Sequence, residues 1–385
     1  MRTPEEFDEI RPYDPEELPA VIEELIADPE FRAAAEHVLP GVPYEQACAQ
    51  LRSCRTNLEV QIKMFYPLLH GLLEKCARDF RLAGTERVDK RVPHTFITNH
   101  RDIVTDSAFL SVGLLDNDFG NTVEIAIGDN LLIRPWIKKL VRVDKAFIVQ
   151  RSAGLRQMLA SSARMSRYMH YAIGTKHENI WIAQREGRAK DSDDRTQDAI
   201  LKMMAMGGEG SITERLKQLN LTPVALSYEY DPCDYLKAQE FQQKRDIEGF
   251  KKSPADDLLN MQTGIFGYKG RICFRMAECL NGFLDSLPAD LPRTELFDVV
   301  AKHIDREIHR NYELYPGNYA AADLLRGTQD FARHYTAEER AQFEAYLEGQ
   351  VRKVTFPQPD TAFLRERLLT MYANPVFNHE AAVHE

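Results

Sequence analysis

One histidine in this sequence stands where a general base is expected. His100 follows an apolar stretch that ends at Ile97, and the next apolar run begins shortly afterwards with Ala-Phe-Leu. The residues up to Ile97 have the pattern of a buried strand, and Asp106 with Ser107 can cap the helix that follows. His100 is therefore predicted in a strand-to-helix turn, where its side chain can face a cleft near the free amides of the helix N-terminus.

An aspartate beside His100 would complete this chemistry. A carboxylate that accepts a hydrogen bond from one ring nitrogen fixes the tautomer, so that the other nitrogen can take a proton from a substrate hydroxyl. Asp106 and Asp102 can both fill this role, and the residues alone leave the choice open. The other interpretation is a loop histidine that caps backbone groups and performs no chemistry.

Basic residues follow two other buried stretches of the sequence. The residues of interest at these two ends are Arg151, Glu186, Gly187, Arg188 and Lys190. Guanidinium groups bind phosphate through paired hydrogen bonds, so beside His100 they suit a substrate with a phosphate to hold and a hydroxyl to activate. Gly187 allows the backbone to approach a ligand closely. Taken singly, each arginine also fits an ordinary surface ion pair.

Strands that alternate with helices are predicted to position these residues. The strand candidates are His94–Ile97, Thr122–Ile127, Ala146–Gln150, Ile180–Ala183 and a stretch entered through Pro223, Pro223–Tyr228. The helical stretches between them include Ser152–Tyr171 and Asp198–Met206. This alternation predicts an α/β sandwich with a largely parallel sheet, in which the loops at the strand ends hold the chemistry.

Helices are predicted on both sides of this central domain. Those before it are Pro15–Ile26, Asp28–His37 and a longer one with apolar residues spaced by three and four from Leu58 to Phe80, followed by a polar connection, Leu82–Arg91. Those after it are Thr294–Tyr312, Tyr319–Leu325, Ala337–Val354 and Thr361–Tyr372. The chain is thus expected to divide into a helical N-terminal region (1–90), an α/β domain (91–285) and a helical C-terminal region (286–385).

Composition excludes several classes of protein. With 44% hydrophobic and 28% charged residues the chain is typical of a globular protein, and its net charge of −10 argues against nucleic-acid binding. The six cysteines form no CxxC pair, so we expect buried thiols in a reducing compartment and no metal site. The N-terminus has no apolar signal core, and no apolar run approaches the roughly 18 residues of a spanning helix. We expect a cytoplasmic protein, free or peripheral at the inner face of the membrane.

The stretches that hold these residues resemble, in order, the four motif blocks of the glycerolipid acyltransferases that use a histidine-x4-aspartate motif. The matching stretches are Asn99–Arg101, Phe147–Arg151, Glu186–Arg188 and Pro223–Glu229, and the resemblance spans roughly residues 90–285. Three departures are present: five residues separate His100 from Asp106, Lys145 stands where the second block has glycine, and the third block is one residue shorter than Glu-Gly-x-Arg. Asp106 is preferred as the partner of His100, because Asp-Ser-Ala-Phe-Leu-Ser resembles the family's continuation, and Asp102 is the alternative.

The resemblance implies a reaction and a set of site residues. His100, oriented by Asp106, would remove the proton from a glycerol hydroxyl as it attacks an acyl thioester, and amides near Asp106 would stabilise the oxyanion. Arg151 and Arg188 would hold the acceptor phosphate, with Lys190 as an accessory. The substrate-binding residues implied by the blocks are Arg151, Glu186, Gly187, Arg188, Lys190 and Pro223.

The same resemblance implies the partners. Acyl-CoA or acyl carrier protein would bring the acyl group as a thioester co-substrate, and the acceptor would be glycerol-3-phosphate or lysophosphatidate in phospholipid synthesis. No metal and no permanently bound cofactor is implied. A noncatalytic lipid- or membrane-surface adaptor that has kept the fold is the alternative from another class.

Contact with a membrane surface is expected at Leu131–Val143. A helix that starts at Pro135 places its apolar residues on one face and its basic residues opposite or beside them. The apolar residues are Trp136, Ile137, Leu140 and Val141, and the basic residues are Lys138, Lys139 and Arg142. An ordinary amphipathic helix packed within the protein is the other interpretation.

Overall fold

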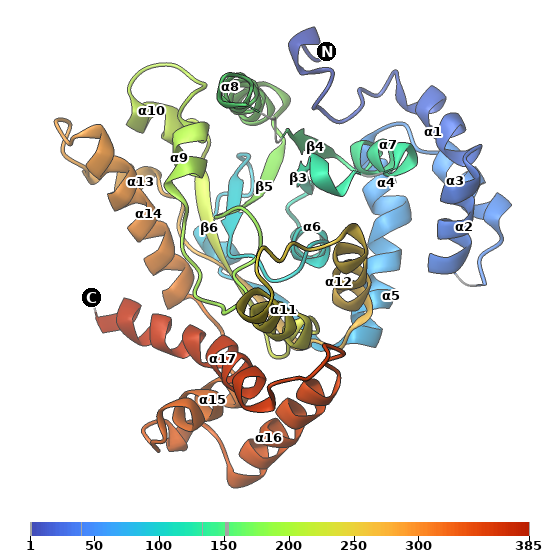
Figure 1. Cartoon of the computed structure of the whole chain (residues 1–385). Coiled ribbons are helices and arrows are strands. Elements are labelled where there is room, and N and C mark those ends of the chain that lie inside the picture. Colours follow the sequence, from blue (N-terminus) through green and yellow to red (C-terminus); the bar gives the residue numbers. More distant parts are fainter. Residues whose placement is uncertain (1, 40, 133, 151–153, 385) are drawn as a thin grey trace.

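A seven-stranded sheet forms the centre of the molecule, with helices on both faces (Figure 1). The structure is a computed structural model and describes residues 2–39, 41–132, 134–150 and 154–384. The strand order is β1-β7-β6-β2-β5-β3-β4, and every neighbouring pair is parallel except β6 and β7. The strands are β1 (Ala77–Ala83), β2 (Thr95–Thr98), β3 (Val123–Gly128), β4 (Ala146–Val149), β5 (Asn179–Ala183), β6 (Leu221–Tyr228) and β7 (Gly270–Met276). The predicted α/β class with a largely parallel sheet is confirmed.

The central strands lie where the apolar pattern predicts them. β2 lies between β5 and β6, and all of its residues are buried. Ile97 is in register with Ile182 of β5 on one side and with Pro223 of β6 on the other. Because these strands are parallel, their carboxyl ends meet at one edge of the sheet, and the loop with His100 begins there.

Two strands at one side of the sheet were not predicted. The helix expected to continue to Phe80 ends at Cys76, and Ala77–Ala83 forms β1 beside β7. The polar connection predicted from Leu82 is therefore wrong at its start, because Leu82 belongs to this strand. Phe80 and Leu82 lie on one face of this edge strand. Because Phe80 also follows Cys76 at helical spacing, the apolar pattern of the preceding helix hides the start of the strand. The N-terminal ninety residues are therefore not wholly helical.

The helices flank the sheet as two layers. They are α1 (Leu18–Ile26), α2 (Pro29–Val38), α3 (Tyr44–Arg52), α4 (Asn57–Val60), α5 (Tyr66–Cys76), α6 (Thr105–Asp116), α7 (Pro135–Val143), α8 (Leu155–Tyr171), α9 (Asp198–Met204), α10 (Ile212–Lys217), α11 (Asp234–Asp246), α12 (Pro254–Phe266), α13 (Asn281–Ser286), α14 (Arg293–Arg310), α15 (Pro316–Arg326), α16 (Ala337–Arg352) and α17 (Thr361–His384). One apolar core joins α5 and α6 to one face of the sheet through residues such as Phe96 and Phe109. The other core joins α8, α9 and α14 to the opposite face through residues such as Ile97 and Phe297.

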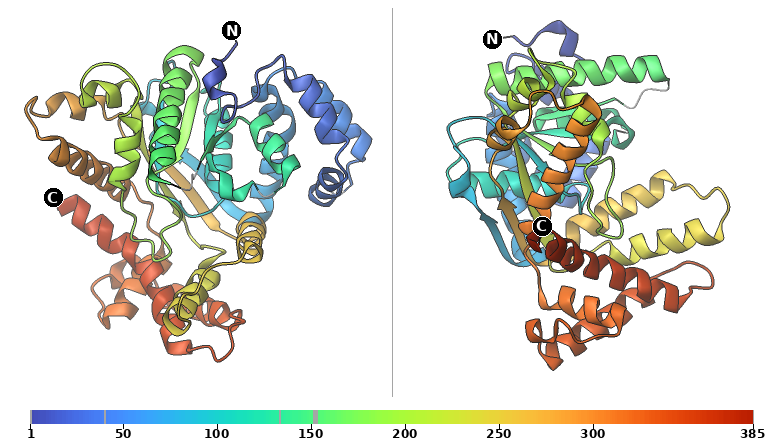
Figure 2. Two further views of the ribbon diagram at one scale, coloured as in Figure 1. Left: turned by 45° about the horizontal axis from the view of Figure 1, so that its top comes forward. Right: turned by 90° about the vertical axis from the view of Figure 1, so that its left-hand side faces the viewer.

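The C-terminal helices form a unit of their own below the sheet (Figures 1 and 2). Helices α15, α16 and α17 share an apolar core that includes Phe343 and Leu368, and Ala238 of α11 belongs to it. The four helices predicted for this region are present, and the last of them continues past Tyr372 to His384. These helices thereby approach the edge of the sheet where the strands end.

Helix α7, the predicted membrane contact, packs against the N-terminal helices. Trp136 and Leu140 join the apolar cluster of α1 and α3, and Trp136 also donates a hydrogen bond to Glu30 at 3.0 Å. Arg142, expected opposite or beside the apolar face, is buried, and its Nε donates to the backbone oxygen of Arg11 at 2.7 Å. Two of the four apolar residues of the predicted membrane face therefore pack on the N-terminal helices, as in an ordinary amphipathic helix within the protein, and a membrane contact at this segment stays a prediction. Within the described part of the chain, no helix is long and apolar enough to cross a membrane.

Candidate active site

The loop that follows β2 is fixed to the sheet by Asn99. Its amide nitrogen donates to the backbone oxygen of Leu226 at 2.9 Å, and its side-chain oxygen accepts from the amide of the same residue at 2.8 Å. The side chain thus extends the pairing of β2 with β6 by one residue, as a buried backbone group would. His100 begins its turn from this fixed point.

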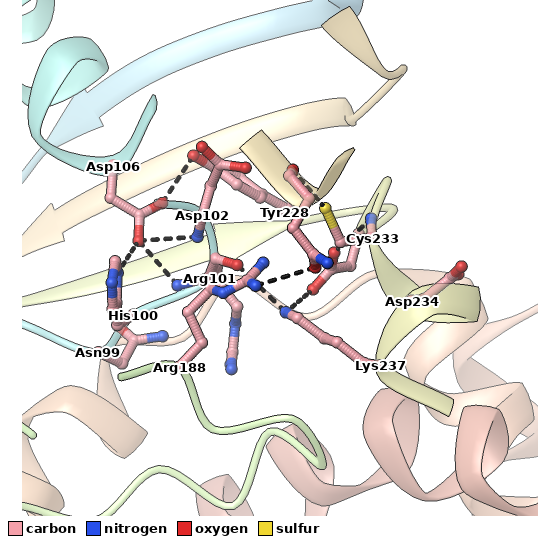
Figure 3. Close-up of polar contacts among 12 residues, drawn as sticks. Asn99, His100, Arg101, Asp102, Asp106, Arg188, Tyr228, Cys233, Asp234 and Lys237 are labelled. Carbon is pink, nitrogen blue, oxygen red and sulfur yellow. Dashed lines mark hydrogen bonds and ion pairs between the residues drawn. The ribbon is translucent and has the colours of Figure 1, made fainter. Parts of the chain in front are cut away.

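His100 is held by Asp106 from the first turn of α6 (Figure 3). Its Nδ1 lies 2.8 Å from Oδ2 of Asp106, and the amides of Arg101 and Asp102 donate to the same oxygen at 2.7 Å and 3.0 Å. The hydroxyl of Tyr228, at the end of β6, donates to Oδ1 at 2.9 Å. Each oxygen of this buried carboxylate is therefore occupied, and the imidazole is bound to an acceptor that cannot turn away.

The other ring nitrogen of His100 is available for chemistry. A carboxylate only accepts, so Nδ1 bears the proton and Nε2 keeps its lone pair. Among the described residues no hydrogen-bond partner contacts Nε2, and the side chain is 13% exposed. The ring of Trp181 packs edge-on against the imidazole with centroids 5.7 Å apart. The arrangement is that of an oriented, largely buried general base.

Asp102, the alternative partner of His100, has a different role. Its Oδ1 accepts hydrogen bonds from the amides of Val104 and Thr105 at 2.9 Å and 2.8 Å, and so it caps α6. The prediction that Asp106 and Ser107 cap this helix is wrong, because the helix begins one turn earlier, at Thr105.

Four of the amides near Asp106, where an oxyanion site is expected, are already engaged within the turn. The amides of Arg101 and Asp102 donate to the carboxylate of Asp106, and those of Val104 and Thr105 donate to that of Asp102. A carboxylate that already accepts two such bonds gives them up only at a cost of about 1 kcal/mol or more for each. These four amides therefore serve to shape the turn.

Arg101 joins the histidine loop to a buried carboxylate that the sequence analysis missed. Its Nη2 lies 2.7 Å from Oδ2 of Asp194, which also accepts from the hydroxyl of Tyr312 at 2.5 Å. Although burial opposes the charge of the guanidinium, Asp194 holds the pKa of Arg101 above its ordinary value. Asp194 follows the third motif block by only a few residues, but no spacing rule marks it as a partner of Arg101.

A second buried cation supports the same loop from α11. Lys237 donates to the backbone oxygen of Arg101 at 3.1 Å and forms an ion pair with Asp231 (Figure 3). Burial would raise the pKa of Asp231, but Lys237 outweighs it and the pKa is lowered. The histidine loop is therefore fixed on both sides by buried ion pairs, which favours a rigid site.

The third motif block turns one basic side chain inward and leaves the rest in solvent. Arg188 Nη2 donates to Oδ1 of Asn260 on α12 at 2.9 Å, while its Nη1 is buried without a partner among the described residues. Glu186 and Gly187 are exposed, and Gly187 has a φ of +70°, a conformation that favours glycine. Figure 3 shows Arg188 beside Arg101 and His100. The structure thus brings Arg188 toward the histidine, and Glu186 stays outside.

Lys190 is engaged elsewhere. It forms an ion pair with Glu240 of α11, whose carboxylate also lies 3.0 Å from Lys244 and 3.0 Å from Lys252. Burial lowers the pKa of Lys190 to about 8, and Glu240 opposes this shift. The ammonium is therefore not directed at the histidine loop as an accessory ligand would be.

The remaining predicted site residues lie apart from His100 or outside the described structure. Arg151 lies outside the described residues. Pro223 is buried within β6 beside Ile97, so it shapes the sheet below the loop.

Lys145 has a φ of +60°, where glycine is the usual residue, and its buried ammonium lies 2.7 Å from Glu178. Lys145 therefore has the left-handed backbone conformation that is usual for glycine.

Comparisons with known proteins give a likeness among solved structures. No family model and no curated protein matches the sequence. The fold is similar to the crystal structure of the 1-acyl-sn-glycerophosphate (LPA) acyltransferase PlsC from Thermotoga maritima, with 10% sequence identity and a TM-score of 0.36 over 74% of this chain and 94% of that chain. A likeness at this level places no residue and no substrate.

Proposed function

We propose that the protein is an O-acyltransferase that moves a fatty acyl group from a thioester to a hydroxyl of glycerol-3-phosphate or lysophosphatidate. The observation that supports this proposal most is the 2.8 Å contact between His100 Nδ1 and the buried Asp106, which leaves Nε2 free beside the edge of the sheet. The order of the four motif blocks in the sequence supplies the reaction class. No side chain of the protein has to be acylated in this reaction.

The proposed reaction proceeds by direct attack. Nε2 of His100 takes the proton of the acceptor hydroxyl while its oxygen bonds to the thioester carbonyl carbon. The tetrahedral intermediate then collapses, the carbon–sulfur bond breaks, and the imidazolium returns the proton to the leaving thiolate. Asp106 stabilises the imidazolium between these steps, because its negative charge is held at Nδ1.

Arg188 is the described residue that best fits an acceptor phosphate. Its Nη1 is buried without a partner among the residues that the structure describes, and an unpaired buried guanidinium nitrogen is costly unless a ligand binds it. Two parallel hydrogen bonds from a guanidinium to phosphate oxygens would satisfy this group. Arg151 remains a proposed second phosphate ligand on the strength of the sequence motif.

The donor is proposed as acyl-CoA or acyl carrier protein, which acts as a co-substrate, and the chemistry needs no permanently bound cofactor. We place the reaction in phospholipid synthesis in the cytoplasm, with transient contact to the inner face of the membrane. The outcome that would favour the noncatalytic adaptor is binding of lipid without turnover.

A panel of acceptors tests this function. Purified full-length protein is incubated with radiolabelled acyl-CoA or acyl carrier protein thioester and either glycerol-3-phosphate, lysophosphatidate or an uncharged monoacylglycerol. We expect acylated product with a phosphorylated acceptor and little with the uncharged one. Absence of product with every donor and acceptor, in a folded protein that still binds lipid, would establish the adaptor instead.

A further inference from the structure

Helix α12 has the reverse of the usual distribution of apolar side chains. Asn260 and Gly264 on its inner face are buried, whereas Leu258, Leu259 and Phe266 on its outer face are 49%, 46% and 56% exposed. A helix of a globular protein normally turns its apolar stripe inward, and a group of exposed apolar side chains marks a contact surface. We refer to Leu258, Leu259 and Phe266 as the α12 outer face.

The inner face of the same helix lies directly on the candidate active site. A Cβ added to Gly264 would lie 1.8 Å from Oδ2 of Asp102, so only glycine allows this close packing. Asn260 binds Arg188 at 2.9 Å, and the ammonium of Lys269 closes the end of the helix at the backbone oxygen of Gly267, 3.0 Å away. Helix α12 therefore covers the site on one side and presents apolar side chains on the other.

The α12 outer face lies on a projecting part of the molecule. Helices α11 and α12 extend together from the body as a hairpin, on the side toward the viewer in Figure 1 and on the right in the second view of Figure 2. The first turns of α8 reach the same side, and there Met158 and Leu159 are also exposed. The two separate segments that hold these exposed apolar residues thus reach the same side of the molecule.

Basic residues accompany both segments. Lys251 at the start of α12 and Arg156 beside Met158 are exposed, and within the described part of the chain neither pairs with a carboxylate. Lys252 also lies at this end of the hairpin, where it contacts Glu240 and Asp257. An apolar face bordered by unpaired cations is complementary to a layer of lipid with anionic headgroups.

We propose that the α12 outer face, with Met158 and Leu159, rests on an anionic lipid bilayer surface and brings the active site to its lipid substrate. The choice of this occupant rests on the proposed function, and the placement differs from the α7 segment, where Trp136 and Leu140 pack on the N-terminal helices. Leu258, Leu259 and Phe266 enter the headgroup region, and Lys251 and Arg156 contact the anionic headgroups.

Vesicle flotation of the full-length protein tests this surface without an enzyme assay. Vesicles of phosphatidylcholine alone and of phosphatidylcholine with phosphatidylglycerol are compared for wild type and for the variant Leu259→Ser/Phe266→Ser. We expect wild type to float with the anionic vesicles. At the same lipid concentration, the fraction of the variant that is bound should be lower by about tenfold or more. Val383→Ser is the matched control, because Val383 is an apolar residue on α17 with 48% exposure, and it should float as wild type does.

Other outcomes contradict the proposal. If the double variant floats as well as wild type, or wild type binds neither vesicle, the α12 outer face is not a membrane contact. If wild type forms a dimer in solution that the double variant abolishes, a second copy of the chain covers this face. Turnover with a short-chain, water-soluble thioester and glycerol-3-phosphate separates this proposal from the enzymatic one. Unchanged turnover in a variant that no longer floats supports the membrane contact. Flotation of wild type without any turnover supports the membrane contact and contradicts the proposed enzymatic function.

Discussion

The hydroxyl of Tyr228 donates to Oδ1 of Asp106, the oxygen that His100 does not contact, at 2.9 Å. Burial and the neighbouring Asp106 raise the pKa of Tyr228 well above its ordinary value, so the hydroxyl remains a donor. Tyr228 thereby fixes the rotation of the carboxylate that orients the imidazole, from a strand more than a hundred positions later in the chain.

Tyr228→Phe removes this hydrogen bond and little volume. We expect kcat to fall while KM for both substrates stays nearly constant, because the change acts on the base through Asp106 and not on substrate binding. The proton resonance of His100 Nδ1–H should move as well, since its acceptor has lost a competing donor. Tyr312→Phe is the matched control, because Tyr312 gives its hydroxyl to Asp194 instead, and an equal effect of both variants would mean that Tyr228 has only a structural role.

Asp106→Asn and Asp102→Asn separate the two aspartates. In Asp106→Asn the amide cannot stabilise an imidazolium, so turnover should fall strongly while the protein stays folded. In Asp102→Asn the amide oxygen can still cap α6, so the loss should be limited to about 1 kcal/mol of unfolding free energy with turnover preserved. Urea unfolding and steady-state rates measure both quantities, and an active Asp106→Asn beside an inactive Asp102→Asn would transfer the role to Asp102.

Arg188→Ala should weaken acceptor binding. Loss of a charge-assisted contact to phosphate in a partly dry site costs on the order of 2–3 kcal/mol, so KM for the phosphorylated acceptor should rise far more than KM for the thioester. Lys190→Ala is the comparison, because Lys190 pairs with Glu240 and should leave the acceptor KM nearly unchanged. Equal increases in both Michaelis constants for Arg188→Ala would show that this arginine supports the fold or binds the donor.

Acid should weaken the fold through Glu240. Burial opposes its charge, but hydrogen bonds from Lys190, Lys244 and Lys252 outweigh burial and lower its pKa to about 2. A carboxylate with a lowered pKa contributes stability above its unfolded value, and this contribution is lost as the pH falls from about 4.5 toward 2. In urea unfolding over this pH range, the unfolding free energy of Glu240→Gln should fall less steeply with decreasing pH than that of wild type.

The control for that experiment is Glu24→Gln, which alters an exposed pair with Lys139. Exposed ion pairs contribute little to stability, so the unfolding free energy of this variant should depend on pH as that of wild type does. If Glu240→Gln follows the same slope as wild type, the three lysines do not hold the charge of Glu240 in the folded protein.

The local parts of this structure follow from local patterns. The apolar run up to Ile97 predicts β2, and the polar break after it predicts the turn with His100, because burial on both faces of a central strand leaves a continuous apolar signal. The edge strand β1 was missed, since one exposed face and its bulge between Ala77 and Asp79 mask the alternation. Its partner β7 is the unpredicted strand that lies between β1 and β6.

The partners of the site residues depend on distant parts of the chain. Arg101 meets Asp194 and Asp106 meets Tyr228 only after the strands have paired, and no sequence spacing encodes these contacts. Helix α7 has the amphipathic pattern of a membrane contact, but whether such a face meets lipid or protein depends on which helices pack beside it. An apolar face that does remain exposed belongs to α12.

The central claim is that His100 is the general base of acyl transfer, and the rate of the His100→Ala variant tests it most directly. Product formation from an acyl thioester and a phosphorylated glycerol acceptor is measured for wild type and for this variant, with circular dichroism to verify that both are folded. His309→Ala serves as a control, because His309 is a buried histidine that contacts the backbone oxygen of Asp194. We expect His100→Ala to lower turnover by roughly 10²–10⁴-fold, and near wild-type turnover in the folded variant would contradict the account.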